Sequence, residues 1–337
     1  MAKKILFFNH KGGVSKTTST FNVGWMLASL GKKVLLVDAD PQCNLTAFFL
    51  AERFDEYYVQ SATKDQNLMS GVRSAFEGNP TPIAPITCPT HTRNERLYLL
   101  PGHMNLSELE AQLTFALTAS MTLTSLQNLP GSFNDLIDKT ADKYNIDYVL
   151  IDVNPGLGSI NQDLFLICDG FIIPTNPDLF CIMAINSLAK ILPSWVKWKN
   201  QNIDDFKNAA YPLPNNTPKF IGTIIQRFNI RNGVAARPYQ DIIADIKTTT
   251  KDVFVPALEK MEMLYANDKY NSDFCIEEIK DFAALGQKSQ QFHIPVFALT
   301  DEELGHTGTV LAQSQKSRDS FKMQFQAIAQ YVMNFYE

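Results

Sequence analysis

The chain has 337 residues, of which 45% are hydrophobic and 19% are charged, and its formal net charge is −5. This composition excludes a disordered chain and leaves room for one large α/β domain or two ordinary ones. The negative net charge gives no general attraction to nucleic acid, so a DNA contact would need a local basic patch. The cysteines are widely spaced and form no C-x-x-C pair, which argues against a disulfide framework or a zinc site.

Apolar stretches of the kind used for targeting or membrane insertion are too short here. The run nearest the N-terminus, residues 5–8, is far shorter than the core of a signal peptide. No stretch approaches the roughly 18 apolar residues of a membrane span. Since the cysteines also fit a reducing compartment, we expect a soluble, cytoplasmic protein with no membrane partner.

Short apolar runs recur between polar segments with helical patterns. They are ILFF (5–8), VLLV (34–37), YVLI (148–151), FII (171–173) and FIGTII (220–225). Unbroken apolar strands are those covered on both faces, as in a parallel sheet with helices on either side. The predicted fold class is therefore α/β, with a doubly wound, mostly parallel sheet and helices on both faces.

The first of these repeats, residues 4–38, is predicted to be a βαβ unit. Between its two strands, apolar or small residues follow the i, i+3, i+4, i+7 spacing of one helix face. These residues are Phe21, Gly24, Trp25 and Ala28. Gly31 then stands where the end of a helix favours glycine.

We interpret residues 1–337 as a single domain with two insertions. Residues 51–96 are polar and rich in turn-forming residues, with one short helix expected near 66–77. Residues 231–290 are polar and partly helical and also follow a core strand. The segment 312–335 predicts a C-terminal helix docked on the core, and a helix lying on a membrane surface is the alternative. Its apolar face consists of Phe321, Phe325, Ile328, Val332 and Phe335.

The segment HKGGVSKTT, residues 10–18, lies between the first strand and the first helix. A standard phosphate loop, G-x-x-x-x-G-K-[ST], has glycine where this chain has His10 and Ser15. The order of strand, tight loop and helix is nevertheless what a phosphate cradle requires. Backbone N–H groups and the positive end of the helix then face the anion. Gly12 and Gly13 let the backbone approach it closely.

The side chains of this segment match nucleotide chemistry. Lys16 would reach the β- and γ-phosphates, and the hydroxyl of Thr17 is placed for magnesium. The other loop positions expected to bind nucleotide are Val14, Ser15 and Thr18. If Ser15 adopts a positive φ, serine costs about 1 kcal/mol relative to glycine, which a well-coordinated triphosphate outweighs. Lys11 is not needed to hold one triphosphate in one subunit.

HKGGVSKTT, followed by VLLVDADPQCNLT and YVLIDVNPGLG, resembles the ParA/MinD family of deviant Walker ATPases. The loop pattern of that family, x-K-G-G-x-x-K-[ST], needs no glycine at the two discordant positions. The resemblance continues in LYLLPGHMNLSELE (97–110) and FIIPTNPDLFCIMAI (171–185), and it is weakest in the two insertions. The DPQ-x-N-x-T element and the size point to ParA rather than MinD.

The resemblance implies ATP and Mg²⁺ as cofactors and gives four residues a role. Lys11 would reach across a nucleotide-sandwich homodimer to the partner's phosphates, as an arginine finger does. Asp40 would orient the attacking water, Asp38 would face the magnesium site, and Asp152 would hold magnesium through water. Three carboxylates at strand ends, where ligands bind in parallel sheets, favour this over strand termini or helix caps.

Two positions leave alternatives open. Asn154 stands where the family usually has proline in a D-x-P-P turn, and its amide would either bind the phosphate region or reshape the loop. Gln226 matches a position that often contacts adenine, but a glutamine at a strand end is equally often solvated.

ParA proteins bind DNA non-specifically through basic residues near the dimer face, and this chain departs from them there. Its segment HIPVFALTDEELGH, residues 293–306, has no arginine and three acidic residues in a row. A phosphate-tracking patch and ordinary surface charges remain equal alternatives for the other basic residues. These residues are Arg227, Arg231, Arg237, Lys316, Arg318 and Lys322.

Three functions follow from these features. The first is a ParA-like ATPase that dimerises on ATP and positions a plasmid, chromosome or other cargo, sometimes on the nucleoid. It would hydrolyse ATP slowly until a ParB-like or other partner stimulates it. The alternative is a nucleotide-gated interaction subunit of a defence or regulatory system that binds no DNA, which the acidic balance and the insertions favour. A metabolic function related to the nitrogenase iron protein or to ATP-dependent amidases is the third, but the cysteines show no paired cluster motif.

Overall fold

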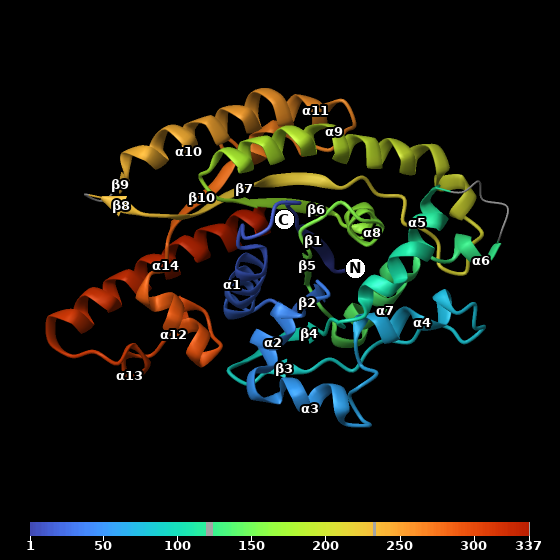
Figure 1. The fold of residues 1–337 in the computed structure, drawn as a ribbon, viewed down its shortest axis with the longest axis horizontal. Helices are drawn as coiled ribbons and strands as arrows, with labels where there is room; N and C mark the ends of the chain where they lie inside the picture. Colours follow the sequence, from blue (N-terminus) through green and yellow to red (C-terminus); the bar gives the residue numbers. More distant parts are fainter. Residues whose placement is uncertain (119–123, 232–233, 337) are drawn as a thin grey trace.

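The computed structural model describes residues 1–118, 124–231 and 234–336 and is built on an eight-stranded sheet (Figure 1). The strands follow the order β10-β7-β6-β1-β5-β2-β4-β3, and neighbouring strands are parallel except for the β3–β4 pair. The strands of this sheet are β1 (Lys3–Phe7), β2 (Val34–Ala39), β3 (Thr90–His91), β4 (Asn94–Leu100), β5 (Tyr148–Val153), β6 (Gly170–Thr175), β7 (Lys219–Phe228) and β10 (Cys275–Lys280). β8 (Ile230–Arg231) and β9 (Val234–Ala235) form a separate two-stranded ladder. The predicted mostly parallel α/β sheet is confirmed.

Helices cover both faces of the sheet. One face carries α4 (Leu68–Phe76), α5 (Glu110–Thr118), α6 (Thr124–Gln127), α7 (Ser132–Tyr144), α8 (Ser159–Ile167), α9 (Leu179–Asn202), α10 (Arg237–Thr249) and α11 (Val255–Glu259). The other carries α1 (Lys16–Ser29), α2 (Asn44–Leu50), α3 (Phe54–Val59), α12 (Ala284–Phe292), α13 (Asp301–Leu304) and α14 (Gly308–Asn334). Figure 1 shows α9, α10 and α11 along one side of β7 and β10, with α1 and α14 on the other side. The joining 3-10 or π turns are η1 (Ala51–Arg53), η2 (Leu106–Leu109), η3 (Ile203–Phe206), η4 (Thr250–Phe254), η5 (Asn267–Lys269) and η6 (Val296–Ala298).

Alternate residues of the central strands supply two separate hydrophobic cores. In β1, Leu6 packs into the core under α7 to α11, whereas Ile5 and Phe7 pack into the core under α1 and α14. Side chains alternate between faces along a strand, so a strand buried on both sides must be apolar at every position. This is why the five apolar runs of the sequence located strands β1, β2, β5, β6 and β7.

The central sheet and α1 approach each other closely at Gly24. A Cβ atom at this position would lie 2.6 Å from Leu36 Cδ2 of β2. The helix ends at Ser29, and Gly31 follows with a φ of 93°, the left-handed conformation expected after a helix. The predicted βαβ unit is therefore present.

The two predicted insertions contain more of the core than expected. The range 51–96 holds the expected short helix as α4, and also β3 and the start of β4. The range 231–290 holds β10, which pairs with β7, so this part of the range belongs to the main sheet. Its sequence CIEEIK carries three charged residues, Glu277, Glu278 and Lys280, and charged residues are typical of an edge strand such as β10, which has one partner.

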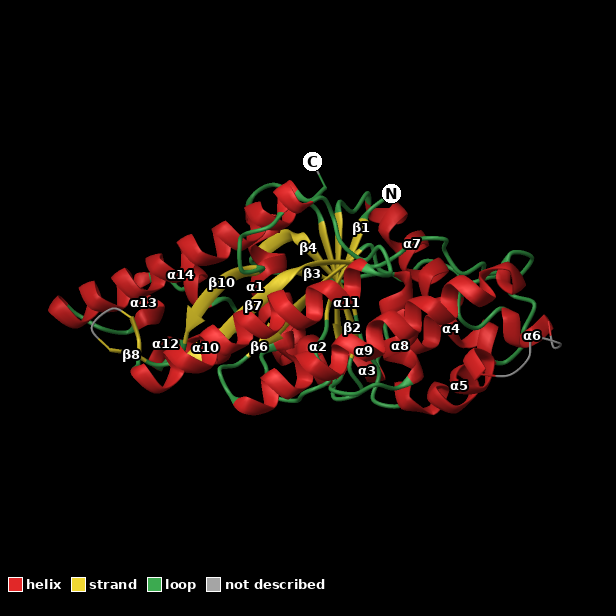
Figure 2. Ribbon diagram, turned by 90° about the horizontal axis from the view of Figure 1, so that it is seen from above, coloured by secondary structure: helices red, strands yellow, loops and turns green. Residues whose placement is uncertain are grey.

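The C-terminal segment forms α14, which begins at Gly308 and covers the predicted range up to Asn334. All five residues of its predicted apolar face are buried. They pack in the core shared with α1, as expected for a docked helix. Both chain termini lie near the amino ends of the parallel strands, where Tyr336 contacts Tyr148 at the start of β5 (Figure 2).

The expectation that no segment resembles a membrane span is wrong for one helix by composition alone. Leu179–Phe206, which comprises α9 and η3, has a mean hydropathy of 1.6 over its most apolar 18 residues. One side of α9 is buried on the sheet, with α8, α10 and α11 beside it. This burial is what a core helix of an α/β sheet requires, and it accounts for the apolar residues on that side of α9.

Candidate functional site

The predicted site residues gather where the central parallel strands end. Strand β5 lies between β1 and β2, and the pairing register sets Asp38 of β2 beside Asp152 of β5. A cavity of about 630 Å³ opens at this edge, between the loop after β1 and the segments that follow β2 and β10. The predicted residues that line it are Gly13, Val14, Ser15, Lys16, Thr17, Thr18 and Asp40. Ligands of parallel α/β sheets bind at this edge.

The loop before α1 has the backbone shape of an anion cradle. Gly13 and Ser15 both adopt positive φ angles, 72° and 60°. Ser15 therefore carries the backbone strain expected for a serine at positive φ, about 1 kcal/mol relative to glycine. Ser15 immediately precedes the first residue of α1, and its side chain does not cap the helix. The first N–H groups of α1 consequently have no partners within the helix and face the cavity. The loop also passes close to the segment after β5, since a Cβ atom at Gly12 would lie 3.7 Å from the Pro155 ring.

Lys16 extends over its own loop. Its ammonium donates hydrogen bonds to the carbonyls of Asn9, at 3.0 Å, and Lys11, at 3.3 Å. The side chain is almost completely buried, and this burial lowers the pKa of Lys16, with Asp152 and Asp40 opposing the effect. A cation is thus held at the floor of the cavity by backbone oxygens.

The carboxylate of Asp38 is fully engaged by its neighbours. Thr46 donates to it from its backbone N–H at 2.8 Å and from its hydroxyl at 2.6 Å, and the Asp40 N–H donates at 3.1 Å. Burial raises the pKa of Asp38 to about 6, although the bonds from Thr46 lower it. Asp38 therefore has little capacity left to bind a metal ion directly.

Asp152 differs from Asp38 because both of its oxygens are buried and accept no hydrogen bond from the described residues. Burial, together with the neighbouring charge of Asp38, raises the pKa of Asp152 well above its usual value. Thr17 and Lys16 lie close enough to oppose this shift. An unsatisfied buried carboxylate is costly, and a cation near Thr17 would remove that cost.

These donors fit a magnesium ion that has further ligands. Within residues 1–118, 124–231 and 234–336, no three His, Cys, Asp or Glu residues lie together as a complete metal site. Mg²⁺ ordinarily binds one or two protein oxygens and takes its remaining ligands from phosphate and water. Thr17 and Asp152 suit that arrangement better than Asp38 does.

Asp40 and Asn154 each follow one of two neighbouring strands, β2 and β5. Asp40 lines the cavity, and its carboxylate accepts a hydrogen bond from the Gln42 N–H at 2.9 Å. Asn154 accepts the side-chain amide of Asn161 at 2.6 Å through its Oδ1 atom. The same amide also reaches the carbonyl of Gly156 at 3.1 Å. Of the two alternatives for Asn154, the structure favours shaping the loop after β5.

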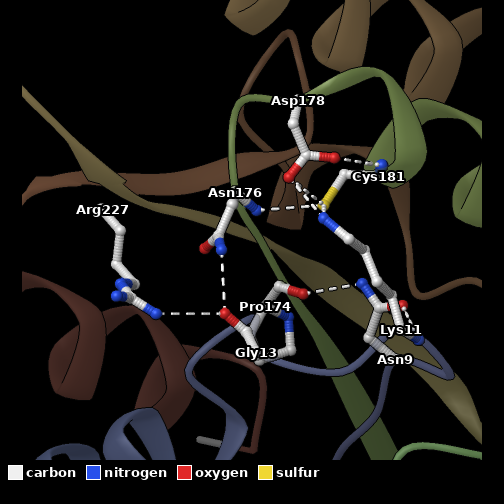
Figure 3. Close-up of polar contacts among 8 residues, drawn as sticks. All are labelled: Asn9, Lys11, Gly13, Pro174, Asn176, Asp178, Cys181 and Arg227. Atoms are coloured by element: carbon white, nitrogen blue, oxygen red, sulfur yellow. Dashed lines mark hydrogen bonds and ion pairs between the residues drawn. The ribbon is translucent and has the colours of Figure 1, made fainter.

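Gln226 and Arg227 end β7 beside the cavity but face different partners. Gln226 is buried, and its amide donates to the Ser19 hydroxyl of α1 at 2.5 Å. Arg227 has a left-handed φ of 61° and donates to the Gly13 carbonyl at 3.4 Å (Figure 3). Arg227 lines the cavity, whereas the sequence offered it only as a DNA contact or an ordinary surface charge.

The outer wall of the cavity comes from residues that the sequence did not single out. They are Phe282, Gly286, Ser289 and Gln290, in and just before α12. They reach the site because β10 pairs with β7, so the segment after β10 ends beside the phosphate loop. No local motif marks such a position.

Lys11 lies outside the cavity. Its ammonium forms an ion pair with Asp178, at the start of α9, and lies 3.4 Å from the Cys181 sulfur (Figure 3). The ring centre of Phe180 is 5.9 Å away. Partial burial lowers the pKa of Lys11, but Asp178 and Cys181 together outweigh this effect, so the pKa is raised overall. The loop thus directs its two lysines to different places.

The basic residues suggested for DNA do not form one patch. Arg318 is paired with Asp301 and Asp319, and Arg227 turns toward the loop. The side chain of Arg231 lies outside the described residues. The remaining three are exposed, Arg237 on α10 and Lys316 and Lys322 on α14, across the sheet.

A strained loop joins the first strand to a helix, and it holds a buried lysine over its backbone carbonyls. Carboxylates lie on the next strands. Together these features define a P-loop nucleotide-binding protein. The family model AAA_31, described as an AAA domain, matches residues 2–204. The chain belongs to this family, the ParA-type P-loop ATPases.

Known relatives agree with this assignment. The sporulation initiation inhibitor protein Soj of Bacillus subtilis is 29% identical over 189 residues, which are 56% of this chain and 64% of Soj. The McdA–ATP complex of Cyanothece has the same fold, with a TM-score of 0.60, 18% identity and 96% of each chain covered. The complex of pNOB8 ParA with nonspecific DNA matches with a TM-score of 0.56 and 18% identity, over 100% of this chain and 99% of that one. The chain spans 50% to 60% of the length of three uncharacterised curated relatives.

Proposed function

We propose that this protein is an ATP-driven switch that forms a sandwich homodimer on ATP and positions a cargo. The observation that carries the proposal is the separation of the two loop lysines: Lys16 lies in the cavity, while Lys11 lies outside it on Asp178. A lysine that its own subunit does not use over the phosphate loop can serve a second subunit once it leaves Asp178. Soj and other ParA-type relatives support this class of function.

Within one subunit, the loop would hold the triphosphate of ATP. The N–H groups at the start of α1 and the ammonium of Lys16 face the same cavity and supply positive charge to it. Thr17 and Asp152 would hold Mg²⁺, which when bound neutralises phosphate charge during phosphoryl transfer. Asp40 lines the cavity with one carboxylate oxygen held by Gln42, so its other oxygen can orient a water.

Hydrolysis would require the second subunit. Lys11 of one subunit would contact the phosphates held by the other and stabilise the charge that develops there. Hydrolysis would remove that contact and let the two subunits separate. The lifetime of bound ATP would therefore set how long the cargo stays bound. The rate would be slow until a stimulating protein, ParB-like or of another kind, engages the dimer.

Non-specific DNA is a candidate partner because a ParA structure of the same fold is a DNA complex. The basic residues left for this role are Arg237, Lys316 and Lys322, on opposite faces of one subunit. A dimer would have to bring them into one surface. DNA affinity that needs ATP and falls steeply with salt would support this partner.

The alternative function, a nucleotide-gated interaction subunit without DNA, rests on Arg318. Its guanidinium is neutralised by its neighbour Asp319 and by Asp301, which belongs to the acidic segment that takes the place of a basic one. Absence of DNA binding at low salt, in a protein that does dimerise, would decide for this alternative.

Gel filtration of the Asp40→Ala variant tests the dimer. This change should slow hydrolysis and leave Lys16 and the loop intact, so ATP should shift the protein to twice its mass. Lys11→Ala in the same background should weaken that shift. A monomer that persists with ATP at high protein concentration would contradict the proposal.

A further inference from the structure

The Lys11–Asp178 ion pair joins two segments that are far apart in the chain, the phosphate loop and the first turn of α9 (Figure 3). Two further side chains lie near the ammonium. The Cys181 sulfur lies 3.4 Å from the Lys11 ammonium, and the centre of the Phe180 ring lies 5.9 Å from the same ammonium. The Lys11 N–H also donates to Asn9 Oδ1 at 3.0 Å, which fixes the direction in which the side chain leaves the loop.

Asp178 uses its two oxygens for different purposes. Oδ1 accepts the Cys181 N–H at 2.9 Å and so caps α9, while Oδ2 pairs with Lys11. Asparagine at this position would keep the cap, because its side-chain oxygen is an equally good acceptor, but would lose the charge. The structural and electrostatic contributions of Asp178 can therefore be separated by one substitution.

The ion pair with Asp178 is incompatible with the contact that Lys11 would make to the phosphates of a second subunit in the proposed dimer. One ammonium cannot remain on Asp178 and also lie on the phosphates of another subunit. We propose that Asp178 is a positioning residue that holds Lys11 aside in the single subunit and gives it up when the phosphates of a second copy compete for it. This inference rests on the proposed function, since it concerns the same lysine.

The position of the pair allows such an exchange. The Lys11 side chain is 24% exposed and that of Asp178 is 36% exposed, so the pair can open without unfolding any core. Beside it, Asn176 donates to the Gly13 carbonyl at 2.9 Å, which ties the strand before α9 to the phosphate loop. A movement of the phosphate loop would therefore also move the segment that holds Asp178.

The expected effect is modest per subunit and larger in the dimer. Partly exposed ion pairs shift an equilibrium by at most about fivefold. A dimer breaks the pair twice, so removing it should tighten the dimer by up to about 25-fold. The effect must disappear when Lys11 is absent.

The test measures the dissociation constant of the ATP dimer by sedimentation, with Asp40→Ala in every protein to slow hydrolysis. Asp178→Asn should lower this constant by about fourfold to 25-fold. Asp204→Asn removes an exposed pair with Lys207 far from the loop and should change nothing. In a Lys11→Ala background, Asp178→Asn should have no effect. An unchanged or weaker dimer in the Asp178→Asn protein would overturn the inference while leaving the dimer itself established.

A second measurement uses no dimer. The acylation rate of Lys11 by a small amine-reactive activated ester, which transfers its acyl group to the free amine and releases its leaving group, is followed by mass spectrometry without nucleotide, with Lys207 as the internal standard. Asp178→Asn should raise the rate at Lys11 severalfold, because the ammonium loses its partner. Equal rates in both proteins would overturn the inference. A protein that stays monomeric with ATP but shows the rate difference would contradict the proposed function and retain the holding role of Asp178.

Discussion

The part of the chain matched by the family model, residues 2–204, and the remaining C-terminal part contribute differently to the site. The first part supplies the floor of the cavity, with the loop, Lys16 and the strand-end carboxylates. The second part supplies the outer wall, through Arg227 and the segment around α12. Phosphate chemistry is therefore encoded locally, whereas the surroundings of a bound nucleotide depend on the pairing of distant strands.

The largest effect should come from the floor. Lys16→Ala removes the buried ammonium and should lower ATP affinity and ATPase activity by roughly 100-fold or more, as loss of a preorganised charge does. Titration with a fluorescent ATP analogue and steady-state hydrolysis measure both. Lys207→Ala, at an exposed lysine, is the control. A Lys16→Ala protein with near-normal affinity would show that the wall, not the floor, binds the nucleotide.

His91 joins the two parts. Its Nε2 atom donates to the His293 carbonyl after α12 at 3.3 Å, and rings of Phe21, Trp25 and Phe49 surround it. Burial lowers its pKa to about 4, so the folded protein binds fewer protons than the unfolded chain between about pH 4 and 6.5. Its contribution to stability is complete above pH 6.5 and is lost on acidification, by up to about 3 kcal/mol near pH 4.

Urea unfolding of the parent and the His91→Gln variant at pH 7.5 and pH 4.5 measures this contribution. Their difference in unfolding free energy should favour the parent at pH 7.5 and shrink or reverse at pH 4.5. Asp38 contributes in the opposite sense, because its raised pKa favours the folded state at lower pH, and the variant retains Asp38. A difference independent of pH would show that His91 does not titrate as described.

Gly222 tests how strongly the second part depends on strand pairing. It lies in β7 with a φ of 156°, and a Cβ there would lie 2.6 Å from Ile276 and 3.0 Å from the Phe274 carbonyl of the β10 side. Gly222→Ala should cost about 2 kcal/mol of unfolding free energy through this overlap. Gly78→Ala, at a positive φ with nothing nearby, should cost about 1 kcal/mol and is the matched control. Equal losses by denaturant titration would mean that β10 moves aside freely.

Arg227→Ala should have the smallest effect. Removing an exposed guanidinium that lines the cavity and contacts the Gly13 carbonyl should weaken ATP binding by up to about tenfold and leave stability unchanged. Calorimetric titration with ATP and ADP measures this, and Lys322→Ala is the control for lost positive charge. An unchanged affinity for ATP would show that Arg227 is an ordinary surface charge.

The sequence predicted most of what depends on local patterns. Unbroken apolar runs located five strands, and the loop motif located the phosphate cradle with Ser15 in a strained conformation. The edge strand β10 was missed because the charged residues in CIEEIK interrupt the apolar run that marked β1, β2, β5, β6 and β7. Asn154 could not be resolved because its partner, Asn161, is fixed only by the three-dimensional shape of the loop. The position of Lys11 on Asp178 could not be predicted either, since the two residues are brought together by the parallel order of β6 and β1.

The action of Lys11 on a second subunit can be measured most directly by mixing two inactive proteins. Lys11→Ala keeps Asp40 but lacks the lysine, and Asp40→Ala keeps the lysine but lacks the carboxylate. If Lys11 acts across the dimer, a mixed dimer has one complete site, and an equal mixture should recover about a quarter of normal ATPase activity by random assortment. If the mixture stays as inactive as its components while both proteins dimerise on ATP, Lys11 does not act on the partner and the account is contradicted.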